Sequence, residues 1–540
     1  MIPEAQLGDS VSAADALADA VAVQHKRSTP SVARRALSSL HSAMAKAEGE
    51  VTVAVRHLPD GDQIVAAWPG YVDAAYGIAV DVGSTTVAGH LCELKSGEIV
   101  SSYGLMNPQI RFGEDLMSRV SYVMMNPGGE VELTNAIRAA LNEMINGLVT
   151  KADVDIERVL EITIVGNPIM HHIVLGIDPT PLGMAPFVLA TSESVSGWAN
   201  ELDLKLPNAS YYVGPCIAGH VGADTAAAIL AEGPHRSSEM QLLVDIGTNA
   251  EIVLGNTEKQ FAASSPTGPA FEGAQISAGQ RATAGAIEHV RIDRETLEPR
   301  VKVIGSDLWS DEPGFVESLG DTAVTGICGS GIIEVIGEMY LSGIIDQDGV
   351  VRGELANKSP RIVGDDRTFS YLFYESGETK LYVTQNDVRA IQLAKAALRA
   401  GIDLLVEHAG SPIVQDIRLA GAFGAHIDPV YAMVLGLVPD CPVAGVRAVG
   451  NAAGAGAVQS LLSRKLRHEM EAAVRKVTKI ETATEPRFQQ LFVEAMAFPH
   501  KTAETPNLAK VIDLPARSLN NNDGQSRSGR RRRSASGVAE

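Results

Sequence analysis

A short stretch near the start of the chain places a carboxylate, a glycine and hydroxyl side chains at the end of an apolar run. In GIAVDVGSTTVAG, Asp81 and Gly83 are followed by Ser84, Thr85 and Thr86. A glycine lets the backbone approach a ligand closely or take a positive φ. Hydroxyls and backbone amides at such a tip suit a phosphate, and a carboxylate suits a hydrated Mg²⁺ ion. We interpret the stretch as a strand, a tight turn and a second strand, with an ordinary polar hairpin as the alternative.

The same pattern returns in QLLVDIGTNAEIVLG, where Asp245 precedes Gly247, Thr248 and Asn249. Neither stretch has the spacing of a P-loop or of a dinucleotide-binding fingerprint. A repeat at positions 81 and 245 is too long for a solenoid and predicts two similar domains instead. Two such tips would hold a polyphosphate from both sides, with Asp81 and Asp245 bound to Mg²⁺ through water.

Two glycine-rich segments follow later in the chain. In DIRLAGAFGAHID, a strand runs into a turn made of Gly421, Ala422, Phe423 and Gly424. Glycines there would let the backbone lie against a flat ring. In VRAVGNAAGAGAVQSLL, a helix rich in small residues begins after Gly450 and Asn451. Close packing between helices is an alternative explanation for those small residues.

A long amphipathic helix is predicted in TQNDVRAIQLAKAALRAGIDLLVEH, with Thr384 as its N-cap and Asp387 in its first turn. The apolar face consists of Ile391, Ala394, Leu398, Ile402 and Leu405. A second face carries Gln392, Lys395 and Arg399. Such a polar face is usually solvated, but it could also reach a nucleotide.

The two ends of the chain have a different character. A helix is predicted over 31–47, followed by strands over 51–58 and 63–68, which form a small α+β piece. Residues 1–30 are expected to be flexible. From about 516 the sequence has no apolar periodicity and is expected to be disordered, and its four arginines at 530–533 are expected to be solvated.

The composition of the chain argues against several classes of protein. The chain has 540 residues and a net charge of −20, which argues against general nucleic-acid binding. No apolar run is long enough for a membrane span, and no secretory signal is visible. The four cysteines, Cys92, Cys216, Cys328 and Cys441, lie far apart, so no iron–sulfur cluster is expected in this chain. Free thiols fit a cytoplasmic location.

These motifs, in this order, resemble those of the acetate and sugar kinase, chaperone ATPase and actin superfamily. The resemblance implies an α/β fold, a duplicated ribonuclease-H-like (actin-type ATPase) two-lobed fold that binds ATP and Mg²⁺. By motif, the two hairpins match the phosphate-1 and phosphate-2 elements, and Gly421 to Gly424 match the adenosine element.

Within this superfamily the chain is most similar to the reductive activators of corrinoid proteins. The similar strings include NPQIRFGEDLMSRV from Asn107, VGNPIMHHIVLGIDPTPLGMAPF from Val165 and TGPAFEGAQISAGQRATAGAI from Thr267. VGADTAAAI from Val221, GICGSGIIE from Gly326 and the helix from Thr384 continue the resemblance, which covers roughly 75–500. It implies an ATPase that drives reduction of Co(II) to Co(I) in a corrinoid methyltransferase protein.

Such activators usually begin with a ferredoxin-like domain that carries a two-iron two-sulfur cluster, and no cysteine spacing for one occurs here. A separate ferredoxin or flavodoxin is therefore the expected electron donor, and a homodimer is one possibility. A misassigned start of the chain, or a protein that kept only the ATPase switch, are the alternatives. The expected domains are 31–74, a partial middle or dimerisation-type domain; 75–235, a first ATPase lobe; 236–500, a second lobe with a return to the first near its end; and 501–540, a tail.

Several single residues have candidate roles. Asp224 in VGADT is the candidate for orienting the attacking water. Ser264 is a candidate contact to the cobalt face of a docked partner, although a turn whose serines cap Pro266 and the next helix is the favoured alternative. Residues 262–273 are expected to form a surface loop. His171 and His172 suggest a metal site, but packing or capping is favoured because adjacent helical residues point apart. Cys328 is expected to be an inert buried thiol.

Two other functions remain open at this stage. A small-molecule kinase on the same fold would need a substrate pocket, and no sugar-binding motif stands out. A chaperone-like reactivator that exchanges damaged cobalamin would need no electron transfer, and the missing cluster cysteines favour that role.

Overall fold

The computed structural model describes residues 2, 11–58, 60–113, 115–364, 367–424 and 426–516, with the backbone alone at 422 and 423. The chain divides into two compact units. The first unit comprises Met1–Glu272, Ala397–Pro429 and Cys441–Phe492, and the second comprises Gly273–Ala396, Val430–Asp440 and Val493–Glu540. The tail predicted to be disordered from about 516 lies outside the described residues. The domain limits given by the sequence stay a prediction.

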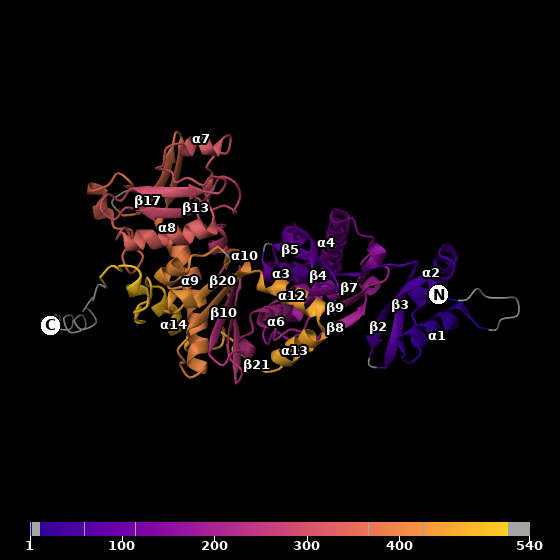
Figure 1. Ribbon diagram of the computed structural model, residues 1–540. Helices are drawn as coiled ribbons and strands as arrows, with labels where there is room; N and C mark the ends of the chain where they lie inside the picture. The colour runs from indigo at the N-terminus through magenta and orange to yellow at the C-terminus, as the bar shows by residue number, and fades with distance from the viewer. Residues whose placement is uncertain are drawn as a thin grey trace, which may run out of the picture. The chain divides into compact units, whose positions relative to one another are not determined.

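The first unit contains a six-stranded sheet whose first three strands form an antiparallel meander (Figure 1). In spatial order its strands are β6 (Ile99–Met106), β5 (Thr86–Glu93), β4 (Tyr76–Val82), β7 (Val159–Gly166), β9 (Ser210–Val213) and β8 (Val195–Trp198). Strand β4 pairs in parallel with β7, and β7 pairs in parallel with β9. The hairpin predicted around Asp81 is thus the β4–β5 hairpin at the centre of this sheet.

A second six-stranded sheet in the same unit repeats this arrangement. In spatial order its strands are β20 (Val446–Gly450), β19 (Asp416–Ala420), β10 (Gln241–Ile246), β11 (Ala250–Gly255), β12 (Gln260–Ser265) and β21 (Val477–Lys479). Strands β10, β11 and β12 form an antiparallel meander, and β10, β19 and β20 run parallel. The repeated meander and parallel pair confirm the duplicated fold expected from the two hairpin sequences.

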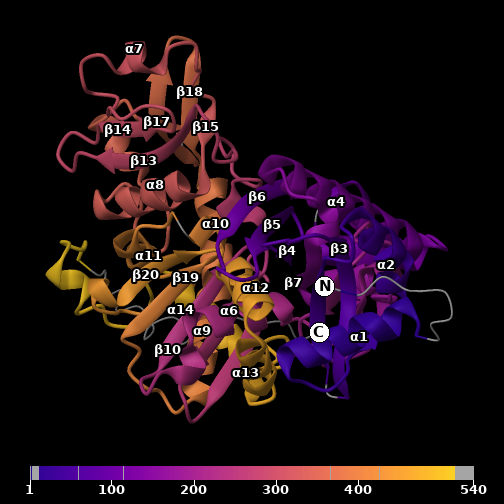
Figure 2. The same ribbon diagram turned by 45° about the vertical axis from the view of Figure 1, so that its right-hand side comes forward.

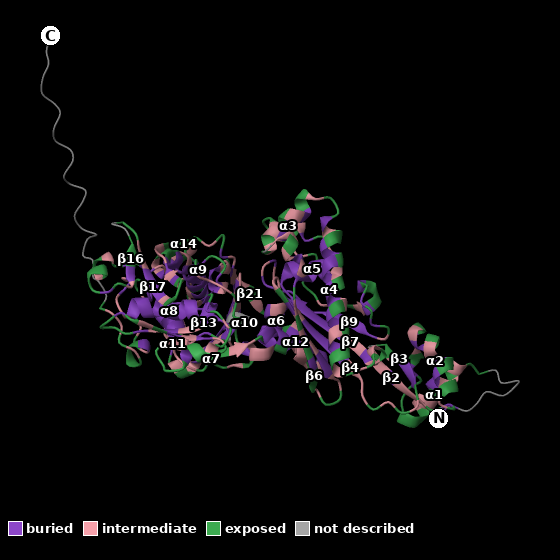
Figure 3. Ribbon diagram, turned by 90° about the horizontal axis from the view of Figure 1, so that it is seen from above, coloured by how far each residue is buried: buried purple, intermediate pink, exposed green. Residues whose placement is uncertain are grey.

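Helices cover both faces of the first sheet. Besides those of the N-terminal piece, this unit contains the helices α3 (Leu116–Met125), α4 (Gly129–Ala152), α5 (Pro168–Leu175), α6 (Ala223–Glu232), α10 (Gly421–Gly424), α12 (Ala452–Leu462) and α13 (Arg464–Val474). Ile78, Val80 and Val82 of β4 share a core with α4, whereas Ala79 shares a core with α6 and α12. This alternation follows from the period of two in a strand. Figure 3 shows the buried residues concentrated in these strands.

Helices α6 and α12 lie side by side in Figures 1 and 2 and pack closely. A Cβ atom on Gly456 would lie 1.9 Å from the carbonyl oxygen of Ala227, so only glycine allows this approach. The small residues predicted in α12 therefore serve helix packing, as the alternative explanation proposed. The same helix also packs on β4 and β7.

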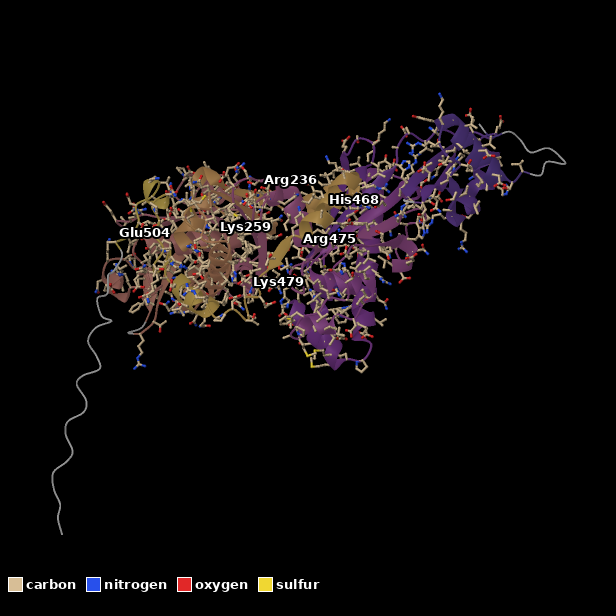
Figure 4. The ribbon with its side chains drawn as sticks, turned by 90° about the horizontal axis from the view of Figure 1, so that it is seen from below. Arg236, Lys259, His468, Arg475, Lys479 and Glu504 are labelled. Atoms are coloured by element: carbon tan, nitrogen blue, oxygen red, sulfur yellow. The ribbon has the colours of Figure 1, made fainter. Side chains whose placement is uncertain are left out.

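Ion pairs join helix α13 and the residue after it to other parts of the first unit. Two of the residues involved, Arg236 and Arg475, are labelled in Figure 4. Nε of Arg236 and Nε2 of His235 lie 2.5 and 2.8 Å from Oε1 of Glu469. Arg475, just after the helix, lies 2.7 Å from a carboxylate oxygen of Glu193. Pairs of this kind on a surface contribute little to stability, so the buried apolar side of α13 is what holds it in place.

The N-terminal piece belongs to the first unit and contains α1 (Ala13–His25), β1 (Ser31–Val32), α2 (Arg34–Lys46), β2 (Val51–Leu58) and β3 (Gly61–Pro69). The predicted hairpin of two strands is confirmed, and β1 adds a parallel strand beside β3. One correction follows: the helix predicted from 31 begins at Arg34. Residues 13–25 also form a helix, whose Leu17 shares a core with Ala36 and Leu40.

The second unit contains two three-stranded sheets. They consist of β14 (Pro299–Val303), β13 (Ala286–Ile292) and β15 (Gly326–Ile327), and of β16 (Ile362–Gly364), β17 (Phe369–Ser376) and β18 (Thr379–Val383). Helix α8 (Gly329–Leu341) packs on β13, where its Glu334 and Glu338 accept backbone N–H groups of Val290 and Ile292 at 3.0 and 3.2 Å. The unit also includes α7 (Phe315–Leu319).

Three further helices contain residues assigned to both units: α9 (Gln385–His408), α11 (Pro429–Leu435) and α14 (Phe488–Ala495). The 3₁₀ helices are η1 (Pro108–Phe112), η2 (Ile156–Arg158), η3 (Thr180–Gly183), η4 (Ala199–Leu202), η5 (Pro234–Arg236), η6 (Pro269–Glu272), η7 (Gly353–Asn357), η8 (Val443–Gly445) and η9 (Leu508–Lys510). Among the described residues, no helix combines the length and the apolar character needed to cross a membrane.

Helix α9 begins as predicted. The backbone N–H of Thr384 donates to Asp387 at 2.8 Å, and the N–H of Asp387 donates to the Thr384 hydroxyl at 3.2 Å, which is a reciprocal cap. The predicted apolar face is buried at every position. The prediction that the polar face is solvated is wrong, because Gln392, Lys395 and Arg399 are also buried.

Candidate functional site

The turn of the first hairpin lies between β4 and β5. Asp81 is opposite Ala88 in the register, and the amide of Gly83 donates to the carbonyl of Thr86 at 3.0 Å. A Cβ atom on Gly83 would lie 2.7 Å from that carbonyl oxygen, so the tight turn requires glycine. Ser84 and Thr85 at the tip are partly exposed and Thr86 is exposed. The turn therefore presents two or three hydroxyls and their amides beside one carboxylate.

The turn of the second hairpin has the same form. Asp245 is opposite Glu251 in the register of β10 and β11, and the amide of Gly247 donates to the carbonyl of Asn249 at 3.2 Å. The hydroxyl of Thr248 donates to Oε1 of Glu272 at 2.9 Å. Glu272 therefore fixes the side chain of Thr248, one of the predicted phosphate ligands.

Four carboxylates influence one another in the first unit: Asp81, Asp224, Asp245 and Glu251. Burial and then the negative charge of Asp224 raise the pKa of Asp81 to about 7. Burial, followed by the charges of Asp224 and Asp81, raises the pKa of Asp245 to about 7. Burial, followed by Asp224 and Asp245, also raises the pKa of Glu251 well above its ordinary value. The two hairpin aspartates, far apart in sequence, therefore belong to one electrostatic cluster.

Asp224 is at the start of α6, in its first turn. Its Oδ1 accepts the N–H of Thr225 at 2.6 Å. Burial raises its pKa to about 6, although the hydrogen bonds from Thr225 lower it. A Cβ atom on Gly222 would lie 2.8 Å from Oδ1 of Asp224 and 2.6 Å from Cα of Asn167, so the glycine lets this carboxylate approach the end of β7.

The two later glycine segments meet the same carboxylates. The side-chain amide of Asn451 donates to Oδ2 of Asp81 at 3.0 Å. Gly421 has a φ of +92°, and a Cβ atom on it would lie 2.6 Å from Oδ1 of Asp245. Gly450, with a φ of +69°, ends β20 directly before Asn451. The side chains of Ala422 and Phe423 lie outside the described residues, and Gly424 is buried.

The carboxylate cluster fits a hydrated divalent cation. Burial and then the negative charges of neighbouring carboxylates raise the pKa of Asp81 and Asp245, and a cation between them would offset that repulsion. Within the described ranges, no three His, Cys, Asp or Glu side chains are arranged as direct metal ligands. Contact through water is the mode that Mg²⁺ prefers, since it keeps several of its waters. The donor set therefore suits Mg²⁺ bound to a phosphate and held from the protein side by water-mediated contacts.

Lys395 does not belong to this cluster. It is fully buried in the second unit, where its Nζ donates to the carbonyls of Ala497 and Pro499, the latter at 2.9 Å. Nζ also lies 4.8 Å from the ring centroid of Phe498. The nucleotide contact of Lys395 stays a prediction, and in this structure its ammonium group holds the backbone at 497–499.

The predicted loop around Ser264 is partly wrong. Residues 260–265 form β12, and Ser264 pairs with Glu251 in the register of that strand. Its carbonyl oxygen accepts the hydroxyl of Thr482 at 3.0 Å. The second half of the predicted loop includes η6. The contact of Ser264 with a partner stays a prediction.

The histidine pair and Cys328 have structural positions. Nδ1 of His172 donates to the carbonyl of Pro168 at 2.8 Å, and Nε2 accepts the backbone N–H of Ala190 at 3.0 Å. His171 is 2% exposed and lies beside it. The burial and the hydrogen bonds of the pair agree with the predicted packing role. Cys328 is a buried free thiol, as expected.

Sequence reasoning missed two groups of residues. Glu251 follows the second turn on β11 and carries no motif of its own, although its register opposite Asp245 follows once the hairpin is drawn. Asn107 and Arg119 contact the first turn from behind, and the string NPQIRFGEDLMSRV that contains them was noted only as a resemblance.

Comparison with known proteins agrees with this geometry. Residues 76–237 match the family described as the RACo middle region, and residues 239–509, just over half of the chain, match the C-terminal domain of RACo, the ASKHA domain. The corrinoid activation enzyme RamQ of Eubacterium limosum is 35% identical over 430 residues, which is 77% of this chain and 69% of that protein.

A second relative is the [Co(II) methylated amine-specific corrinoid protein] reductase of Methanosarcina barkeri, 26% identical over 388 residues, or 67% of this chain and 66% of that protein. The chain thus spans about two thirds of the length of these curated relatives. The solved structure of a reductive activator for corrinoid, iron-sulfur protein aligns with a TM-score of 0.79 and 30% identity, covering 92% of this chain and 78% of the other. The chain therefore belongs to the family of corrinoid reductive activators in the ASKHA superfamily, as its sequence resemblance indicated.

Proposed function

We propose that this protein activates corrinoid proteins and uses ATP to drive reduction of their cobalt from Co(II) to Co(I). The observation that carries the proposal is the electrostatic cluster of Asp81, Asp224 and Asp245, two of which belong to repeated hairpins. Three neighbouring acids do not stabilise a fold by themselves, because like charges repel. A Mg²⁺–triphosphate bound between the turns would offset that repulsion.

Each group has a role in this proposal. Ser84, Thr85 and Thr86 bind phosphate oxygens from the first turn, and Thr248 and Asn249 do so from the second. Gly83 and Gly247 allow the close approach. Catalysis of the step that forms ADP depends on positioning and on electrostatic stabilisation of the phosphates, as in other phosphoryl transfer reactions. Bound Mg²⁺ would supply neutralisation of phosphate charge, with Asp81 and Asp245 holding its waters.

Two further groups complete the site. Asp224 accepts a hydrogen bond from Thr225 through Oδ1, and we assign its carboxylate to the orientation of the attacking water. Its pKa of about 6 is in the range where a carboxylate can take a proton near neutral pH. The segment Gly421–Gly424 is assigned to the adenosine moiety, and Gly450 and Asn451 border it.

The redox step transfers one electron to Co(II). The donor we propose is a separate one-electron carrier of the ferredoxin or flavodoxin class, and ATP is converted with water to ADP and phosphate. ATP can influence this step only if its binding or hydrolysis changes the contacts with the corrinoid protein. Binding of the γ-phosphate between the two hairpins is the event that would change them.

The test combines the protein with a cognate Co(II) corrinoid protein, MgATP and a low-potential one-electron donor. We expect Co(I) to form, followed by its absorbance, only when ATP is present. D81N and D245N should abolish the ATP effect while the donor alone gives the same background. Co(I) formation at the same rate without ATP, or a phosphorylated small molecule formed in step with ADP, would overturn the proposal.

A further inference from the structure

A polar network lies directly behind the first hairpin turn and has no role in the proposal above. Its centre is Arg119 of α3, which is 0% exposed. Nη2 of Arg119 donates to the carbonyl of Ser84 at 2.5 Å, and Nε donates to the carbonyl of Gly113 at 3.1 Å. Nη1 lies 3.3 Å from Oε1 of Gln109. One side chain therefore joins the turn, the loop before α3 and η1.

Asn107 holds the two neighbouring carbonyls of the turn. Its Nδ2 donates to the carbonyl of Gly83 at 2.9 Å, and its backbone N–H donates to the carbonyl of Thr85 at 2.8 Å. Its Oδ1 accepts the N–H of Gln109 at 3.0 Å, which fixes the orientation of the amide group. Three successive carbonyls, at 83, 84 and 85, are thus engaged by the same network.

Burial of a charged guanidinium at this position has an unfavourable desolvation free energy. Burial lowers the pKa of Arg119 to about 10, against the favourable charge of Asp115. An apolar side chain would pack there without that desolvation cost. The planar guanidinium offers donors in several fixed directions at once, which neither lysine nor an apolar residue can do. Its contacts with the turn therefore explain why arginine occupies the position.

The contacts with the turn carbonyls also determine the direction in which the N–H groups of the turn point. In a trans peptide unit the C=O and the following N–H point in opposite directions. Carbonyls held on the network side therefore direct the N–H groups of Ser84, Thr85 and Thr86 to the opposite side. Within the described part of the chain, the amides of Ser84 and Thr85 have no protein acceptor. Successive free amides of this kind bind anions.

We infer that Arg119, together with Asn107, is a positioning residue that fixes the first turn so that its amides face the terminal phosphates of ATP. The inference rests on the ATP binding proposed above. It assigns a task at the nucleotide site to the string that begins at Asn107, through the contacts of Asn107 and Arg119 with the turn.

The experiment compares the full-length protein with R119M, R119K and the matched control R111M, which removes an exposed arginine from the same segment. Affinities for ATP, ADP and AMP are measured with Mg²⁺ present, and thermal unfolding is followed for each variant. We expect R119M to weaken ATP binding about ten- to a hundredfold, as for loss of a charged hydrogen bond, and AMP binding less than twofold. R119K should be intermediate, and R111M should match the unaltered protein.

The outcomes separate the possibilities. ATP and AMP binding weakened by the same factor would show that Arg119 only supports the fold, which overturns the inference. Unchanged ATP affinity in both variants would overturn it as well. If R119M does not fold, R119K, which keeps the charge and most of the volume, decides the question by its ATP-to-AMP ratio. Failure of the unaltered protein to bind ATP would instead remove the proposed function.

Discussion

The side-chain amide of Asn451 donates to Oδ2 of Asp81 at 3.0 Å and so joins two positions 370 residues apart in the chain. The same side chain caps α12, because its Oδ1 accepts the N–H of Gly454 at 2.7 Å. Asn451 therefore has two separable tasks, one for helix stability and one for the orientation of a carboxylate in the candidate site.

Substitution of Asn451 can separate these tasks. N451A loses both, and we expect it to lower the free energy of unfolding by about 1 kcal/mol through loss of the cap. N451S keeps a capping oxygen but is too short to hold Asp81, so its stability should stay within about 0.5 kcal/mol of the unaltered protein. Both should bind MgATP more weakly. Denaturant unfolding and calorimetry measure the two effects, and full MgATP affinity in N451S would show that Asn451 is only a cap.

Removal of one charge from the carboxylate cluster should have opposite effects on stability and on binding. Burial and then the negative charges of Asp224 and Asp81 disfavour the ionised form of Asp245, so D245N should stabilise the protein measured without Mg²⁺ and nucleotide, by about 1 kcal/mol. The same variant should lose the rise in melting temperature that Mg²⁺ with ATP gives the unaltered protein. D60N, at an exposed position, is the control. A D245N protein that is less stable without ligand would contradict this electrostatic account.

His171 predicts a particular dependence of stability on pH. Burial, followed by the charge of His172, lowers the pKa of His171 to about 4. In the unfolded chain the same group binds a proton near pH 6.5, so between pH 6.5 and 4 the unfolded state holds more protons. Stability is therefore lost as the pH falls through this window, by up to about 1.4 kcal/mol per pH unit.

The measurement for this prediction is the slope of unfolding free energy against pH. H171Q cannot take up a proton and should show a shallower slope between pH 6.5 and 4, whatever its stability at pH 7. H41Q, which removes an exposed histidine, should keep the slope of the unaltered protein. Equal slopes for H171Q and the unaltered protein would mean that His171 is not the group that resists protonation.

Lys395 predicts a loss of stability without a loss of nucleotide binding. K395M keeps much of the side-chain volume but leaves the carbonyls of Ala497 and Pro499 without their donor. Leaving buried acceptors unsatisfied costs about 1–3 kcal/mol each, so the free energy of unfolding should fall by a few kcal/mol. K380M, which breaks an exposed ion pair with Glu375, should change little. ATP affinity should be unchanged in folded K395M, and a marked loss would return Lys395 to the nucleotide site.

The sequence was sufficient where local patterns decide the structure. The hairpins at Asp81 and Asp245 and the helix from Gln385 were predictable because alternation, tight-turn glycine and a reciprocal cap act within a few residues. The duplication was predictable for the same reason, since each sheet starts from a recognisable hairpin. The solvated face of α9 was wrong, because helical periodicity identifies a polar face but not what covers it.

Features that depend on distant segments were not predictable. Strand β1 has two residues, and its partner β3 begins about 30 residues later. Arg119 and Asn107 are polar residues with no spacing that marks them, and only the folded chain brings them beneath the first turn. The cluster around Asp224 likewise depends on the approach of α6 to both hairpins, which no local pattern encodes.

The strand order of the second sheet also bears on synthesis of the chain. Its central strand β10 ends at Ile246, but the parallel neighbour of β10, strand β19, comes only at Asp416, and β21, which pairs with β12, only at Val477. Both follow an excursion that leaves the first unit at Glu272. On a ribosome, the first sheet can close its parallel pairs once residue 213 has emerged, whereas β10 waits with an open side through more than a hundred further residues. Unpaired strand edges invite wrong partners. A nascent chain of this architecture is therefore most vulnerable to aggregation, and most dependent on chaperones, between these two moments of translation.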